Sequence, residues 1–175
     1  RSLIGCHDEC MASITFQGNP VQTVGELPEV GAQAPSFELV GADLAPVSSE
    51  ELAGRRVILS IFPSLDTGVC AKALREFNER ATALENTTVV CASKDLPFAA
   101  ERFCSAEGIE NVSTGSAFRS SLGEDYGVTM ADGPLEGLLS RAVVVIDEQG
   151  KVVYTQQVSE VTDEPDYDAA LAALV

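Results

Sequence analysis

The sequence predicts a single α/β domain built on a central mixed sheet that is flanked by helices. Its 175 residues are enough for one domain with its own hydrophobic core. Short β-branched apolar runs alternate with helical patterns, and two such runs near the C-terminus are separated by a turn. No apolar run reaches the roughly 18 residues that predict a membrane span, and no internal repeat occurs.

The N-terminal part is expected to contain a hairpin and two further strands. Gly18-Asn19-Pro20 is typical of a turn and separates Ile14–Phe16 from Val21–Val24. After a connector that contains Pro and Gly, Ser36–Val40 is a strand candidate. Arg56–Phe62 is mostly apolar and β-branched, which predicts a strand buried on both faces.

Helices and strands alternate in the remainder of the chain. Val69–Leu84 repeats apolar residues at spacings of three and four, as in an amphipathic helix. Pro97 and Gly108 mark the start and the stop of a second helix. The other expected elements are the strands Thr87–Ala92, Ala142–Ile146 and Lys151–Val158, with a turn at Asp147–Gly150, and a helix at Tyr167–Leu174. This order is that of a thioredoxin-like fold with an added N-terminal β-hairpin.

The first ten residues differ from the rest of the chain. Met11 resembles a natural start, so residues 1–10 are interpreted as a non-native or disordered leader and residues 11–175 as the domain. The leader holds the only histidine, His7, between Cys6 and Cys10. These residues offer too few ligands for a closed zinc site, so no metal is expected.

Charge and cysteine usage exclude several classes of protein. The formal net charge of −16 disfavours binding to nucleic acid or to an anionic membrane surface. The five cysteines are odd in number and irregularly spaced, unlike a secreted disulfide scaffold. No C-x-x-C pair occurs. A reducing cytoplasm with a few functional thiols fits this pattern.

One cysteine is placed for chemistry. Cys70 falls in the first turn of the expected helix, where unpaired backbone N–H groups favour negative charge and hence the thiolate. We expect Thr67 to direct its hydroxyl towards this sulfur and Pro63 to shield the pocket. A nucleophilic thiolate also needs donors for the charge that develops on its substrate. Arg141, at the start of a buried strand, is the expected guanidinium.

The P-x-x-x-T-x-x-C spacing of Pro63, Thr67 and Cys70, directly after an apolar strand, closely resembles the peroxidatic motif of peroxiredoxins. From Met11 onward the chain resembles the bacterial thiol peroxidase branch, the atypical two-cysteine peroxiredoxins. The matching stretches are Phe16–Pro20, Phe62–Cys70, Asp95–Ala99, Arg102–Cys104, Ala131–Leu135, Ser140–Asp147 and Glu164–Asp168.

The resemblance implies the roles of the site residues. Cys70 would be the peroxidatic cysteine, which forms a sulfenic acid with hydrogen peroxide or an organic hydroperoxide, and Cys104 the resolving one, which closes an intramolecular disulfide. Thr67 and Arg141 would activate the thiolate and bind the peroxide. The resemblance further implies a homodimer, recycling by thioredoxin, and no metal, haem or flavin cofactor.

The same residues bear on three rival functions. A cysteine hydrolase needs a histidine base, and His7 lies in the leader. A dithiol oxidoreductase would have a second cysteine where Gly68 and Val69 stand. A peroxide-sensing relay without sustained turnover stays open, as does the preferred peroxide. Cys91, inside an apolar strand, is interpreted as a buried, inert thiol.

Overall fold

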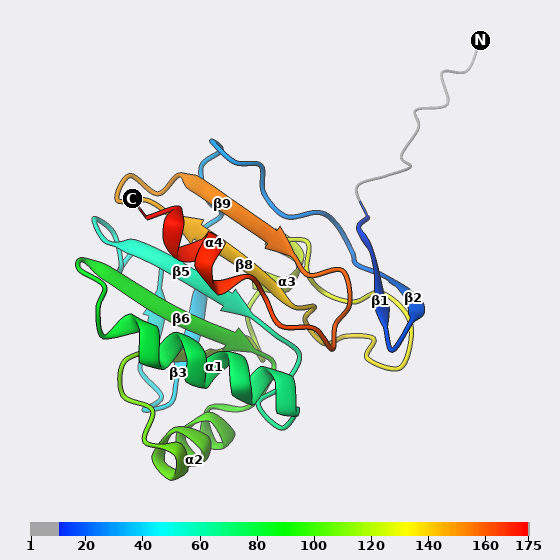
Figure 1. Ribbon diagram of the computed structural model, residues 1–175, viewed down its shortest axis with the longest axis horizontal. Coiled ribbons are helices and arrows are strands. Elements are labelled where there is room, and N and C mark those ends of the chain that lie inside the picture. Colours follow the sequence, from blue (N-terminus) through cyan, green and yellow to red (C-terminus); the bar gives the residue numbers. More distant parts are fainter. Residues whose placement is uncertain (1–10, 175) are drawn as a thin grey trace.

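The computed structural model describes residues 11–174 (Figure 1). The predicted leader therefore lies outside the described residues. The strands are β1 (Ser13–Phe16), β2 (Asn19–Gln22), β3 (Glu38–Gly41), β4 (Pro46–Ser48), β5 (Arg56–Ile61), β6 (Thr87–Ser93), β7 (Ser113–Ser116), β8 (Ala142–Ile146) and β9 (Val152–Gln157). The helices are α1 (Gly68–Ala81), α2 (Pro97–Glu107), α3 (Leu122–Asp125) and α4 (Tyr167–Ala172).

A mixed seven-stranded sheet forms the centre of the molecule, in the order β4-β3-β7-β6-β5-β8-β9. Strand β5 pairs in parallel with β6 and antiparallel with β8. Strands β1 and β2 form a separate two-stranded sheet, which stands on the side towards which β5 and β6 point (Figure 1). The predicted central mixed sheet, flanking helices and N-terminal hairpin are therefore confirmed.

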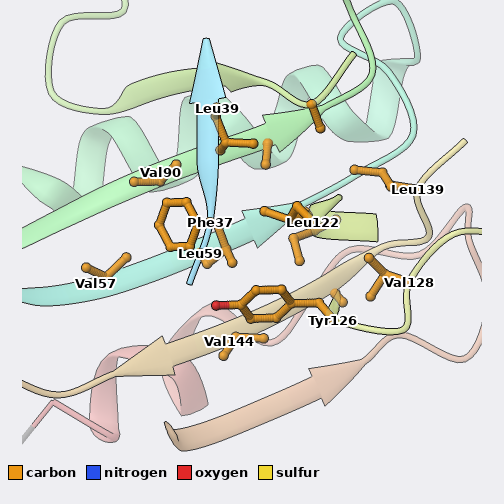
Figure 2. Close-up of a cluster of buried hydrophobic side chains, with 14 of the residues drawn as sticks. Phe37, Leu39, Val57, Leu59, Val90, Leu122, Tyr126, Val128, Leu139 and Val144 are labelled. Carbon is orange, nitrogen blue, oxygen red and sulfur yellow. The ribbon is translucent and has the colours of Figure 1, made fainter. Parts of the chain in front are cut away.

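Alternation along β5 and β8 divides the core between the two faces of the sheet. Leu59 and Val144 belong to a cluster that also holds Phe37 and Tyr126, shown in Figure 2. Ile58 and Val145 belong to a second cluster, packed against α1 and α4. Because successive side chains of a strand point to opposite faces, the continuous apolar runs supply both clusters. The prediction of a strand buried on both faces is confirmed for β5.

Both long helices begin close to where their capping residues predict. Helix α1 has Thr67 as its N-cap and ends at Ala81, three residues before the expected Leu84. Leu84 nevertheless packs against the α1-side core. Helix α2 begins at Pro97, and Gly108 follows it in the left-handed conformation with φ of 66°, as expected of a glycine stop signal.

The hairpin turn differs from the prediction. Phe16 pairs with Asn19, so the turn consists of Gln17 and Gly18, whose φ values of 52° and 81° are those of a tight two-residue hairpin turn. The second strand therefore begins at Asn19 instead of Val21. Pro20 is accommodated inside β2 because a two-stranded sheet leaves edge positions at which no N–H donor is needed.

Three short elements had no counterpart in the prediction: β4, β7 and α3. Within the described part of the chain, no helix is long and apolar enough to cross a membrane.

Candidate active site

The loop between β5 and α1 brings Cys70 to the carboxyl edge of the sheet. Thr67 caps α1: its Oγ1 accepts from the backbone N of Cys70 at 3.4 Å and donates to the carbonyl of Ser64 at 3.0 Å. The hydroxyl proton is therefore used by the backbone. Among the described contacts, Thr67 makes no hydrogen bond to the sulfur, unlike the orientation expected from the sequence.

Asp95, which lies outside the P-x-x-x-T-x-x-C motif, fixes the same loop. Its Oδ1 accepts from the Ser64 hydroxyl at 2.8 Å, and its Oδ2 accepts from the Leu65 backbone N and the Ser93 hydroxyl, both at 2.7 Å. Because Asp95 lies between the end of β6 and the start of α2, this carboxylate joins the Cys70 loop to the helix that carries Cys104. An acidic residue two positions after a buried strand was the available signal.

Arg141 contacts the Cys70 sulfur directly. Ile61 at the end of β5 pairs with Ala142 at the start of antiparallel β8, so Arg141 and the Cys70 loop meet at one edge of the sheet. The Arg141 Nη2 lies 3.1 Å from the Cys70 Sγ, and its Nε donates to the Val161 carbonyl at 2.9 Å. Arg141 is 3% exposed and Cys70 is 0% exposed.

The third guanidinium nitrogen remains available. The Nη1 of Arg141 is buried without a hydrogen-bond partner among the described residues. A buried donor left unpaired costs free energy, so this nitrogen is suited to an acceptor that enters the site. The arrangement presents a sulfur and a free, charged donor side by side.

A cavity of about 290 Å³ opens beside Arg141, and the buried Cys70 is not among the residues that line it. Arg141 lines it, together with the predicted residues Thr67 and Pro63. The other lining residues are Phe16, Gln17, Ser64, Gly68, Val69, Leu135, Leu138, Val161 and Thr162. Two larger hollows, of about 540 and 350 Å³, contain none of the predicted site residues and are not associated with Cys70.

Cys104 lies on α2, half-buried, and packs against the same apolar cluster as Cys70. Burial raises the pKa of the Cys104 thiol, and a hydrogen bond with Thr114 partly opposes this effect. Cys91 is 2% exposed, and burial raises the pKa of its thiol well above the usual range, so its predicted burial is confirmed. All three cysteines within residues 11–174 are free thiols.

Known proteins resemble this chain along most of its length. The Redoxin family pattern matches residues 29–171. A thiol peroxidase of Corynebacterium glutamicum is 62% identical over 164 residues, which cover 94% of this chain and 99% of that protein. A thiol peroxidase of Mycobacterium tuberculosis is 60% identical with the same coverage.

The solved structures give the same result for the fold. A peroxiredoxin-like protein from Aquifex aeolicus superposes with a TM-score of 0.88 at 40% sequence identity, covering 95% of this chain and 98% of that one. The fold is therefore the thioredoxin-like fold of peroxiredoxins, as predicted. Together with the sequence matches, this superposition shows that the chain belongs to the Redoxin family and, within it, to the thiol peroxidases.

Proposed function

We propose that Cys70 is the residue at which this thiol-dependent peroxidase reduces its peroxide. The observation that carries the proposal is the 3.1 Å contact between the Arg141 Nη2 and the Cys70 Sγ, with the Arg141 Nη1 unpartnered. The guanidinium charge favours the thiolate, which is the nucleophilic form of cysteine. Its free N–H group supplies a preorganised donor for the peroxide oxygens in the transition state.

In the first step, the Cys70 thiolate attacks one peroxide oxygen and the O–O bond breaks. The sulfur gives up two electrons and becomes a sulfenic acid, while the other oxygen takes up a proton and leaves as water or an alcohol. Arg141 stabilises the charge that develops on both oxygens. The apolar side chains of Val69, Leu135 and Leu138 in the cavity wall fit the organic part of a hydroperoxide, and hydrogen peroxide needs less room.

In the second step, the Cys104 thiolate attacks the sulfenic sulfur, a disulfide forms and water is released. Packing of both cysteines against one apolar cluster supports this pairing. A disulfide needs Cα atoms within roughly 4.4–6.8 Å. Because the two cysteines lie on α1 and α2, the start of α1, the end of α2 or both must shift before the disulfide closes.

We further propose that thioredoxin reduces the disulfide by thiol exchange and that the enzyme works in the cytoplasm, where free thiols persist. We also propose a homodimer. Leu96, Phe98 and Phe118 are 51%, 66% and 43% exposed, and the hydrogen bond from the Ser116 hydroxyl to the Asp95 carbonyl joins their two segments. Such exposed apolar side chains are typical of a protein interface.

Peroxide-dependent oxidation of thioredoxin by the wild type, Cys70→Ser and Cys104→Ser tests these roles. We expect many turnovers from the wild type and none from Cys70→Ser. Cys104→Ser should consume one equivalent of peroxide and stop, with a sulfenic acid trapped at Cys70. Cys91→Ser is the matched control and should keep turning over.

Peptide mapping without reduction should find the Cys70–Cys104 linkage in the oxidised wild type. Sustained thioredoxin-driven cycling by Cys104→Ser would overturn its role as resolving cysteine. A wild type that stops after one equivalent would instead support the peroxide-sensing relay.

A further inference from the structure

Glu160, in the loop after β9, holds two separate segments with one carboxylate. Its Oε1 accepts from the Thr15 hydroxyl at 3.0 Å and from the Gly18 backbone N at 2.8 Å. Its Oε2 accepts from the backbone N and the hydroxyl of Thr162, at 2.9 and 2.8 Å. The backbone N–H groups of Thr162 and Gly18 are the main reason that the pKa of Glu160 falls to about 2.

Both segments held by Glu160 form walls of the cavity beside Arg141. Between Thr15 and Gly18 lie Phe16 and Gln17, and Thr162 itself follows Val161; all four of these wall residues line the cavity. The β1–β2 hairpin and the loop after β9 lie on the same side of the molecule (Figure 1), and a β-bridge joins Thr15 to Glu160. Glu160, which does not itself line the cavity, therefore joins two of its walls.

The Glu160 carboxylate contacts the hairpin turn, whereas the following backbone hydrogen bonds contact β1 at Thr15. Backbone hydrogen bonds join the Thr15 N to the Ser159 carbonyl and the Val161 N to the Thr15 carbonyl, both at 2.8 Å. These bonds fix β1 at Thr15, whereas the Glu160 carboxylate reaches Gly18 in the turn. The turn residue Gln17 has a φ of 52°, a conformation that non-glycine residues rarely adopt, so this external hydrogen bond helps to keep it in place.

We propose that Glu160 is a positioning residue that sets the hairpin wall of the cavity against the organic part of a hydroperoxide substrate. The inference rests on the proposed reaction at Cys70 and names what selects its substrate. All four partners of Glu160 are donors, so an acceptor-only group with two oxygens is required. Glutamine would turn its NH₂ group towards the donors of either the hairpin or Thr162.

The test compares two peroxides on one set of variants. The rate of Cys70 oxidation in a single turnover is measured with cumene hydroperoxide and with hydrogen peroxide, for the wild type and Glu160→Gln. For Glu160→Gln we expect a loss of about tenfold with cumene hydroperoxide, the size of effect that one methylene group has in an apolar pocket. Hydrogen peroxide, which has no organic part, should lose less than about twofold by the same reasoning.

Controls separate positioning from general damage. Glu110→Gln makes the same change of charge at an exposed residue and should leave both rates unchanged. Thr15→Val removes one donor to Oε1 with little change of shape. It therefore tests the role of Glu160 even if Glu160→Gln does not fold. It should show the same selectivity with a smaller loss.

Equal losses with both peroxides, or no loss with either, in a folded variant would overturn the role of Glu160. Absence of Cys70 oxidation in the wild type with every peroxide would refute the proposed reaction instead.

Discussion

Replacing Arg141 by methionine tests the central contact of the proposed site. Methionine has a similar length and is apolar, so the substitution removes the charge and all donors without opening a large cavity. Three interactions are lost: the Nη2 contact with the Cys70 sulfur, the free Nη1 donor, and the Nε bond to the Val161 carbonyl. The first two concern catalysis, and the third concerns stability.

The expected loss of rate follows from these contacts. A hydrogen bond to a charged group contributes about 1.5–3 kcal/mol, and each 1.36 kcal/mol corresponds to about tenfold in rate. Loss of the sulfur contact alone therefore predicts a decrease of roughly tenfold to 150-fold. Loss of a preorganised donor in the transition state typically costs about 100- to 1,000-fold. Because one guanidinium makes both contacts, we expect Arg141→Met to slow Cys70 oxidation by about 100- to 1,000-fold.

The assay must follow the sulfur itself. The chain has no tryptophan, so quenched-flow alkylation followed by mass spectrometry is more direct than intrinsic fluorescence. Arg141→Lys keeps the charge but lacks the planar arrangement of donors, and it should recover only part of the rate. The buried Val161 carbonyl left without its donor costs about 1–3 kcal/mol of stability, so rates are compared where circular dichroism shows both variants folded. A folded Arg141→Met that reacts within threefold of the wild type would refute the role of Arg141.

Four further predictions concern the surroundings of the site. Thr67→Val removes the N-cap acceptor and should lower the free energy of unfolding by about 1 kcal/mol in urea denaturation, with Thr67→Ser recovering it. Asp95→Asn leaves one of its loop donors unpaired, so limited proteolysis should cut the loop at 64–66 faster. Gly115→Ala places a Cβ 2.6 Å from the Leu39 Cδ1 and should destabilise by about 1–3 kcal/mol; an unchanged melting temperature would contradict this. Burial raises the pKa of Cys91, so the folded state retains this proton to a higher pH than the unfolded chain. The free energy of unfolding should therefore be full below the ordinary thiol pKa and fall above about pH 9. The fall should be less steep in Cys91→Ala.

The elements that sequence predicts well are those with a strong local signal. Strands β5 and β8 are continuous β-branched runs, and their burial on both faces follows from that composition. Helix α2 has a proline in its first turn and a glycine after its last. In each case the residues that define the element also satisfy its backbone or fill its core, so no distant partner has to be known.

Strand β7 shows why other elements escape such reasoning. Its sequence, Ser-Thr-Gly-Ser, contains no large apolar residue, yet three of its four residues are buried. Gly115 lies beneath Leu39 of β3, where even a Cβ would collide. The Ser116 hydroxyl donates to the Asp95 carbonyl. The strand is buried because its neighbours cover it, and its own residues do not predict that cover.

The predicted site shows the same division. The structure brings Cys70, Thr67, Arg141 and Pro63 to one edge of the sheet, because a strand end and a helix start are recognisable locally. Asp95 and Glu160 each accept from one residue nearby in the sequence, Ser93 and Thr162. Their roles also depend on donors from segments at least 30 and 140 residues away, respectively. The sequence around each acid does not identify those distant donors.

The charges around Arg141 bear on the proposed role of Cys70. The protein carries a net charge of −16, yet within residues 11–174 no carboxylate forms an ion pair with this buried guanidinium. A buried charge without a counter-ion is costly. The Cys70 sulfur lies 3.1 Å from the Arg141 Nη2, so in the proposed reaction the thiolate would be the counter-ion of this guanidinium. The hydrogen bond from Lys72 and, as a smaller cause, the charge of Arg141 lower the pKa of the Glu164 carboxyl, but Glu164 forms its ion pair with Lys72. A carboxylate in direct contact with Arg141 would compete with the sulfur for the guanidinium charge, so the lack of such a pair within residues 11–174 supports the proposed role of Cys70.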